Sequence, residues 1–92
     1  MKIPTKVKIG GVIYKVNIED DWLGRDGADG QCFYDGPHGN AIFIGKDLSK
    51  EAREATFIHE ALHAMNSTIN HEFLDSFAEQ IYAFLVDNNL LK

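Results

Sequence analysis

The His-Glu-x-x-His pattern at residues 59–63 constrains this chain more than any other part of it. Its neighbours, residues 56–65, contain good helix formers and neither Gly nor Pro. On a helix, His59 and His63 project from one face one turn apart, so both imidazoles can reach one metal ion at ~2.0–2.1 Å. Glu60 points about 100° away around the axis, which suits a base acting on a metal-bound water rather than a ligand. The pattern therefore predicts metal-assisted hydrolysis, with Glu60 as the catalytic residue.

A pair of histidines on a helix also occurs as a surface feature or inside a core, so the rest of the helix matters. The histidines share their side with Ala52, Thr56 and Asn66, small or polar residues that suit the floor of a cleft. Glu54 falls on the opposite side, and we expect the first turn to project beyond the core. That opposite side otherwise carries an apolar stripe predicted to face the core: Phe57, Ile58, Ala61, Leu62 and Met65.

Composition narrows the class of protein. A chain of 92 residues makes one domain, and a formal net charge of -5 argues against a nucleic-acid-binding surface. The lone Cys32 cannot form an internal disulfide, and it is predicted to occupy a strand rather than to bind metal. No apolar run approaches ~18 residues and no signal region opens the chain, so we expect a cytoplasmic protein without a membrane partner.

Two hairpins are predicted in the first half. Apolar and polar residues alternate over residues 6–18, and Gly10-Gly11 divides this run as a tight turn would. Residues 31–35 and 41–45 read as a second pair of strands around a segment dense in turn residues. His38, at that turn, is predicted to be an exposed loop histidine.

The acidic, glycine-spaced segment 19–30 between the hairpins is predicted to be an irregular loop. Trp22 and Leu23 are expected to anchor it to the body of the protein. Calcium is not expected here, because Asp26, Asp29 and their neighbours lack the spacing of a calcium-binding loop.

These patterns predict an α+β domain covering the whole chain: a small antiparallel sheet in residues 1–45, followed by two helices. The active-site helix is expected over 46–66, capped by Ser49 or Asp47, and a supporting helix over 71–88. The supporting helix carries an apolar stripe predicted to pack on the first: Phe73, Leu74, Phe77, Ala78, Ile81, Phe84 and Leu85.

Two histidines leave a catalytic zinc ion one protein ligand short, and the supporting helix is the obvious donor. Asp75 and His71 lie at the edge of its apolar stripe, whereas Glu72 and Glu79 point toward solvent. Asp75 is our first choice as ligand and His71 the second. Asp75 is alternatively predicted to orient a ligand histidine through its ring N–H. Tyr82, on the same edge, is either a donor to a tetrahedral intermediate or a packing residue.

Residues 57–64 and 81–88 resemble the small zincin-like proteins of bacteriophages and prophages, which are related to the ImmA/IrrE family of metallopeptidases. The resemblance implies a zinc peptidase fold with His59 and His63 as ligands and Glu60 as the base. It also implies an acidic third ligand from the following helix.

Those phage proteins often carry a pair of glutamates early in that helix, where this chain has His71-Glu72. Glu72 is therefore a rival to Asp75 on the resemblance. ImmA-like enzymes cut repressor proteins to release mobile elements. This chain shows no DNA-binding half, so that role is not carried over.

The expected function is hydrolysis of a peptide or protein substrate by a minimal, phage-encoded, Zn²⁺-dependent enzyme in the cytoplasm of a bacterial host. In such enzymes an edge strand holds the substrate by strand addition, and residues 41–45 are predicted to be that strand. The alternative is a zincin-fold module without catalysis that binds a host protein.

Overall fold

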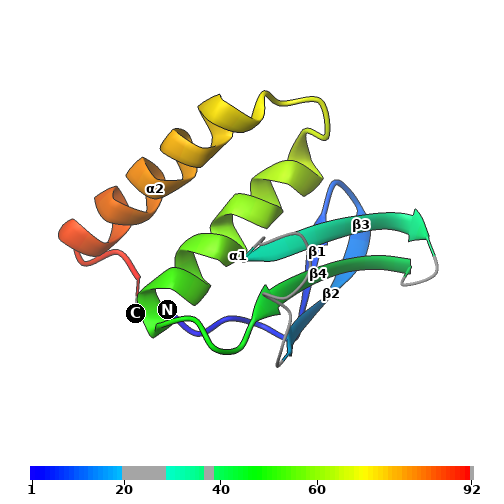
Figure 1. Ribbon diagram of the computed structural model, residues 1–92, viewed down its shortest axis with the longest axis horizontal. Coiled ribbons are helices and arrows are strands. Elements are labelled where there is room, and N and C mark those ends of the chain that lie inside the picture. Colours follow the sequence, from blue (N-terminus) through cyan, green and yellow to red (C-terminus); the bar gives the residue numbers. More distant parts are fainter. Residues whose placement is uncertain (20–28, 37–38, 92) are drawn as a thin grey trace.

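The computed structural model describes residues 1–19, 29–36 and 39–91. These form three layers: a four-stranded sheet, a first helix lying across it, and a second helix packed on the outer side of the first (Figure 1). The predicted order of two hairpins followed by two helices is confirmed, as is the α+β class. The expectations for Trp22, Leu23, Asp26 and His38 concern positions outside the described residues.

The first hairpin joins β1 (Lys6–Ile9) to β2 (Val12–Glu19) in antiparallel pairing. Gly10 and Gly11 form its turn with φ values of 58° and 81°. Two consecutive positive φ values match the right-handed twist of the flanking strands and are tolerated by glycine without strain. The predicted role of this Gly-Gly pair is therefore confirmed.

The second hairpin joins β3 (Gly30–Gly36) to β4 (Gly39–Gly45), again antiparallel. The two hairpins meet through a parallel pairing of β2 with β4, in which Lys15–Glu19 lies opposite Ala41–Gly45. The strand order is β1-β2-β4-β3, and the sheet is mixed rather than wholly antiparallel. The prediction that residues 41–45 form the edge strand is wrong, because β4 is paired on both sides and β3 forms the edge.

Both helices begin at a side-chain cap. The Ser49 hydroxyl accepts a hydrogen bond from the Ala52 N–H (3.1 Å) at the start of α1 (Lys50–Met65). The Asn70 side chain does the same for the Phe73 N–H (3.0 Å) at the start of α2 (His71–Asp87). Each cap satisfies an amide that has no partner inside its helix. Of the two predicted caps for α1, Ser49 is thus the one used.

The main core lies between the sheet and α1. Phe57 and Ala61 of α1 pack against it, as predicted. The prediction that Met65 belongs to the core-facing stripe is wrong, because its side chain is 63% exposed at the end of the helix. The buried residues of the sheet that form this core are Ile9, Tyr14, Val16, Ile42 and Ile44.

Glu54 corrects a second expectation, because it is buried rather than projecting beyond the core. Its Oε1 accepts a hydrogen bond from the Tyr82 hydroxyl of α2 (2.9 Å) and lies 3.6 Å from the α-ammonium group of Met1. Helix α2 and the chain start cover this part of α1, and the two contacts offset the loss of hydration.

Helix α2 packs on α1, on the side away from the sheet (Figure 1). Much of its own apolar surface is uncovered. Leu74 and Ala78 are buried as predicted, but Phe73, Phe77 and Phe84 are exposed. The predicted stripe was too broad because α2 has one neighbouring helix and no sheet beneath it. Among the described residues, no helix has the length and apolarity needed to cross a bilayer.

Candidate metal centre

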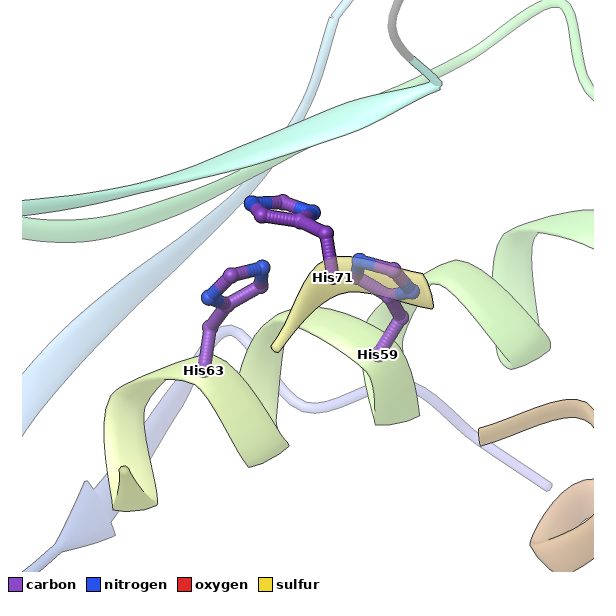
Figure 2. A group of neighbouring side chains, drawn as sticks. All are labelled: His59, His63 and His71. Carbon is purple, nitrogen blue, oxygen red and sulfur yellow. The ribbon is translucent and has the colours of Figure 1, made fainter. Parts of the chain in front are cut away.

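Three histidines converge where the start of α2 passes α1. His59 and His63 rise from consecutive turns of α1 toward His71, the first residue of α2 (Figure 2). One potential ligand nitrogen from each ring lies within 4.8 Å of the other two. The ring centroids are separated by 5.2 Å for His59–His63 and 4.5 Å for His63–His71. Three imidazoles are a ligand set of the number and type that catalytic zinc takes, with a fourth position left for water.

Asp75 lies one turn after His71 and faces a histidine rather than the group's centre. Its Oδ1 is 3.4 Å from Nδ1 of His59. A carboxylate at Nδ1 favours the tautomer that keeps its proton there, leaving Nε2 free for a metal. The geometry favours His71 over Asp75 as third ligand and places Asp75 in the orienting position that was the alternative prediction. Glu72 is exposed and is not among the residues that line the site.

The electrostatics of the two histidines on α1 suit metal binding. Burial lowers the pKa of His59, an effect partly opposed by Asp75. Burial also lowers the pKa of His63, helped by His71 and His59. Both rings are therefore neutral at neutral pH, which is the form that ligates a metal.

Glu60 is buried beside His59, and its pKa is raised. Its side chain is buried, and its Oε2 lies 3.9 Å from Nε2 of His59, on the side of the ring away from Asp75. Burial, reinforced by the charge of Asp75, raises the pKa of Glu60 to about 7. A carboxylate with a pKa near the working pH exchanges protons most effectively.

The histidines lie between two hollows. The larger, of about 590 Å³, runs between α1 and α2, and it has Ala52 and Thr56 on its lining as predicted for the floor of a cleft. The smaller, of about 420 Å³, is lined by β3 and the end of α1. Gly30, Glu60 and His71 line both hollows, so the candidate centre faces each of them.

Strand β3 contributes two site residues that the sequence patterns did not reveal. The Tyr34 hydroxyl donates a hydrogen bond to the His63 carbonyl (2.7 Å), tying the edge strand to the last turn of α1. A Cβ at Gly30 would lie 2.6 Å from the Phe43 carbonyl oxygen and 2.7 Å from Thr56 Cγ2. Only glycine therefore allows β3 to lie this close to α1 beside the histidines. Both contacts depend on tertiary packing, which leaves no local signal in the sequence.

Tyr82 lies apart from the group, and Cys32 lines the smaller hollow beside it without belonging to it. The Tyr82 hydroxyl is bound to Glu54, and burial together with this hydrogen bond raises its pKa to about 12. Tyr82 thus has the packing role that was one of its two predicted roles. Burial raises the pKa of the Cys32 thiol, and this residue lies on β3 as predicted and outside the histidine group.

Comparison with protein-family models, with curated proteins and with solved structures finds no match to this chain. The resemblance to zincin-like phage proteins therefore stays a prediction carried by two short segments. The fit to zinc stands on the residues themselves: three converging imidazoles, two of them neutral through burial, beside a buried carboxylate.

Proposed function

We propose that this protein is a zinc-dependent metallopeptidase in which His59, His63 and His71 hold the ion and Glu60 is the general base. The observation that carries the proposal is the convergence of three imidazoles within 4.8 Å beside a buried glutamate whose pKa is raised to about 7. Structural histidine clusters have no need of such a carboxylate, whereas hydrolysis requires one.

Each residue has a separate task in this proposal. The zinc ion, when bound, supplies a Lewis acid that polarises the substrate carbonyl and lowers the pKa of water. Glu60 accepts the proton of the attacking water and returns it to the leaving amine. Asp75 holds His59 in the orientation and tautomer that ligation needs.

The free edge of β3 is the proposed binding place for the substrate backbone, in place of β4. It runs past Gly30 at the candidate centre to Tyr34, which contacts the last turn of α1. An extended peptide that pairs with an edge strand gains main-chain hydrogen bonds regardless of its sequence. Such a peptide would cross the histidine group with one hollow on either side of it.

A second candidate function is a zinc-binding module without catalysis that binds a host protein. Phe73, Phe77 and Phe84 of α2 favour it, because they leave exposed aromatic surface outside the candidate centre. Exposed apolar patches on small proteins often mark interaction sites. Phage origin and a place in the host cytoplasm belong to either candidate function, and they derive from the resemblance alone.

Zinc analysis and proteolysis distinguish the two functions. We expect one zinc ion per chain, with an X-ray absorption spectrum of three imidazoles and one water oxygen. A mixture of peptides should then be cleaved by the zinc-loaded protein and not by Glu60→Gln loaded to the same zinc content. Four protein ligands, or equal cleavage by both proteins, would overturn the peptidase proposal.

A further inference from the structure

The larger hollow beside the histidines has an acidic wall. Asp29 lies just before β3, while Asp75 and Glu79 lie one turn apart on α2. No lysine or arginine is found among the described residues that line this hollow. Neither Asp29 nor Glu79 forms an ion pair with another side chain in the described part of the structure. Their charges are therefore available to a ligand.

The same three carboxylates line one hollow together with His59. Asp75 Oδ1 lies 3.4 Å from Nδ1 of His59, and Glu79 follows one turn later on the same helix. Side chains from two separate parts of the chain thus bring negative charge to the same hollow. This charge lies beside the candidate centre, where it would attract a cationic ligand.

A buried polar group also points to a ligand in this hollow. Glu60 is 6% exposed and lines the hollow, and Nε2 of His59 lies 3.9 Å from its carboxylate, beyond hydrogen-bonding distance. No described residue donates a hydrogen bond to its carboxylate. Ala52, Ala55 and Ala78 leave a volume of about 590 Å³, which is within the range of ligand sites.

The second hollow is different. Its lining combines Gln31, Cys32, Tyr34 and Ser67 with the shared residues, and Glu60 is its one carboxylate among the described residues. A peptide lying along β3 across the histidines would therefore meet an acidic environment on one side and a nearly neutral one on the other.

We propose that the substrate carries a lysine or arginine next to the scissile bond, and that this side chain enters the larger hollow to meet Asp29 and Glu79. This inference rests on the proposed peptidase function. A partly exposed ion pair contributes little binding free energy, so each carboxylate is expected to contribute a factor of about two to five to the preference for a basic side chain. The preference should also weaken as salt screens these charges.

Peptides that differ at one position next to the cleaved bond test the inference. Lysine there should give a kcat/KM roughly ten times that of methionine, which has a similar length and no charge, and glutamate should give the lowest value. Glu79→Gln should reduce the lysine-to-methionine ratio by about two- to fivefold, and Glu79→Lys should bring it below one. Glu72→Gln, an equal change of charge at an exposed position of the same helix, should leave the ratio unchanged.

A binding measurement keeps this inference separate from the proposed function. Zinc-loaded Glu60→Gln is titrated into fluorescent lysine and methionine peptides and followed by anisotropy, alone and combined with Glu79→Gln. Cleavage without lysine preference, or equal ratios for Glu79→Gln and Glu72→Gln, overturns the inference and leaves the peptidase standing. Lysine-selective binding that Glu79→Gln removes, without cleavage by the wild-type protein, supports a lysine-binding role for the larger hollow and overturns the peptidase. If the protein shows no cleavage and no selective binding, both the inference and the peptidase proposal are overturned.

Discussion

Helix α1, which packs against α2, buries two glutamates whose surroundings differ. At one end of the interface, the Tyr82 end, Glu54 meets the Tyr82 hydroxyl and the Met1 ammonium group. At the other, the histidine end, Glu60 lies among His59, His63, His71 and Asp75. Glu54 has a hydrogen-bond donor and a cation within reach, whereas Glu60 has neither among the described residues.

The contrast shows how to tell a structural carboxylate from a functional one on the same helix. A buried carboxylate that already has partners within the protein holds two elements together and has no free acceptor position for a substrate. One that is buried without a donor destabilises the fold, and such groups concentrate at functional sites. Burial alone does not separate them, since Glu54 and Glu60 are 4% and 6% exposed.

The largest difference between the two ends should be in catalysis. Glu60→Gln keeps the size of the side chain but cannot take a proton, so we expect kcat/KM to fall by roughly 10²–10⁴-fold with zinc content unchanged. Glu54→Gln should leave kcat/KM within about twofold, because its partners lie outside the candidate centre. Peptide hydrolysis by zinc-loaded proteins checks both. Equal losses in the two variants would contradict the division of roles.

Zinc affinity should separate the residues that α2 brings to the histidine end. His71→Ala removes a proposed ligand and should weaken zinc binding by more than about 100-fold. Asp75→Asn retains all three imidazoles and should cost about 10–100-fold, as expected for a residue that orients a ligand. Competition with a zinc chelator measures both. A larger loss for Asp75→Asn would return Asp75 to the ligand position predicted from the sequence.

Much of the histidine end was predictable because its key residues are close in sequence. The spacing of His59 and His63 on a helix determines that they share a face, and Glu60 follows from the same geometry. The predicted helical angle of His71 and Asp75 agrees with the structure, since both line the larger hollow, but Glu79, which was predicted to point toward solvent, lines it as well. Which part of α1 His71 and Asp75 lie beside was not predictable, because that depends on how the connection from residues 66 to 70 places the start of α2.

Two of the errors involve contacts between distant parts of the chain. Glu54 was expected outside the core because its partners come from Met1 and Tyr82, and neither position carries a local signal for it. Strand β4 was expected at the sheet edge because nothing in the sequence signals its parallel pairing with β2. Parallel strands are not joined by a tight turn, so no turn residues mark such a pairing.

Stability without zinc should change in opposite directions at the two ends. The folded protein holds the Glu60 proton up to a pKa of about 7, while the unfolded chain releases it near 4.5. The unfolded chain therefore binds fewer protons between these values, and stability falls as the pH rises through this window. Glu60→Gln removes that loss and should raise the free energy of unfolding by on the order of 3 kcal/mol above pH 7, with no gain below about pH 4.

Glu54→Gln should instead lower the free energy of unfolding by about 1–3 kcal/mol at pH 8, because it removes the acceptor charge shared by Tyr82 and Met1. Urea unfolding in the presence of a chelator, at a series of pH values, measures both variants. Subtracting the wild-type curve removes the titration of the histidines that all the proteins share. A gain from both substitutions would show that Glu54 is also without adequate partners.

The smallest effect is expected from Tyr82→Phe. The change deletes one hydroxyl and its hydrogen bond to Glu54 (2.9 Å), and should lower the free energy of unfolding by about 1 kcal/mol. Activity should be unchanged, because that hydroxyl is committed to Glu54 and Tyr82 lines neither hollow beside the histidines. Urea unfolding and peptide hydrolysis on the same preparation give the two values. A fall in kcat with stability preserved would restore Tyr82 as a donor to the reaction and extend the catalytic part of the interface to the Tyr82 end.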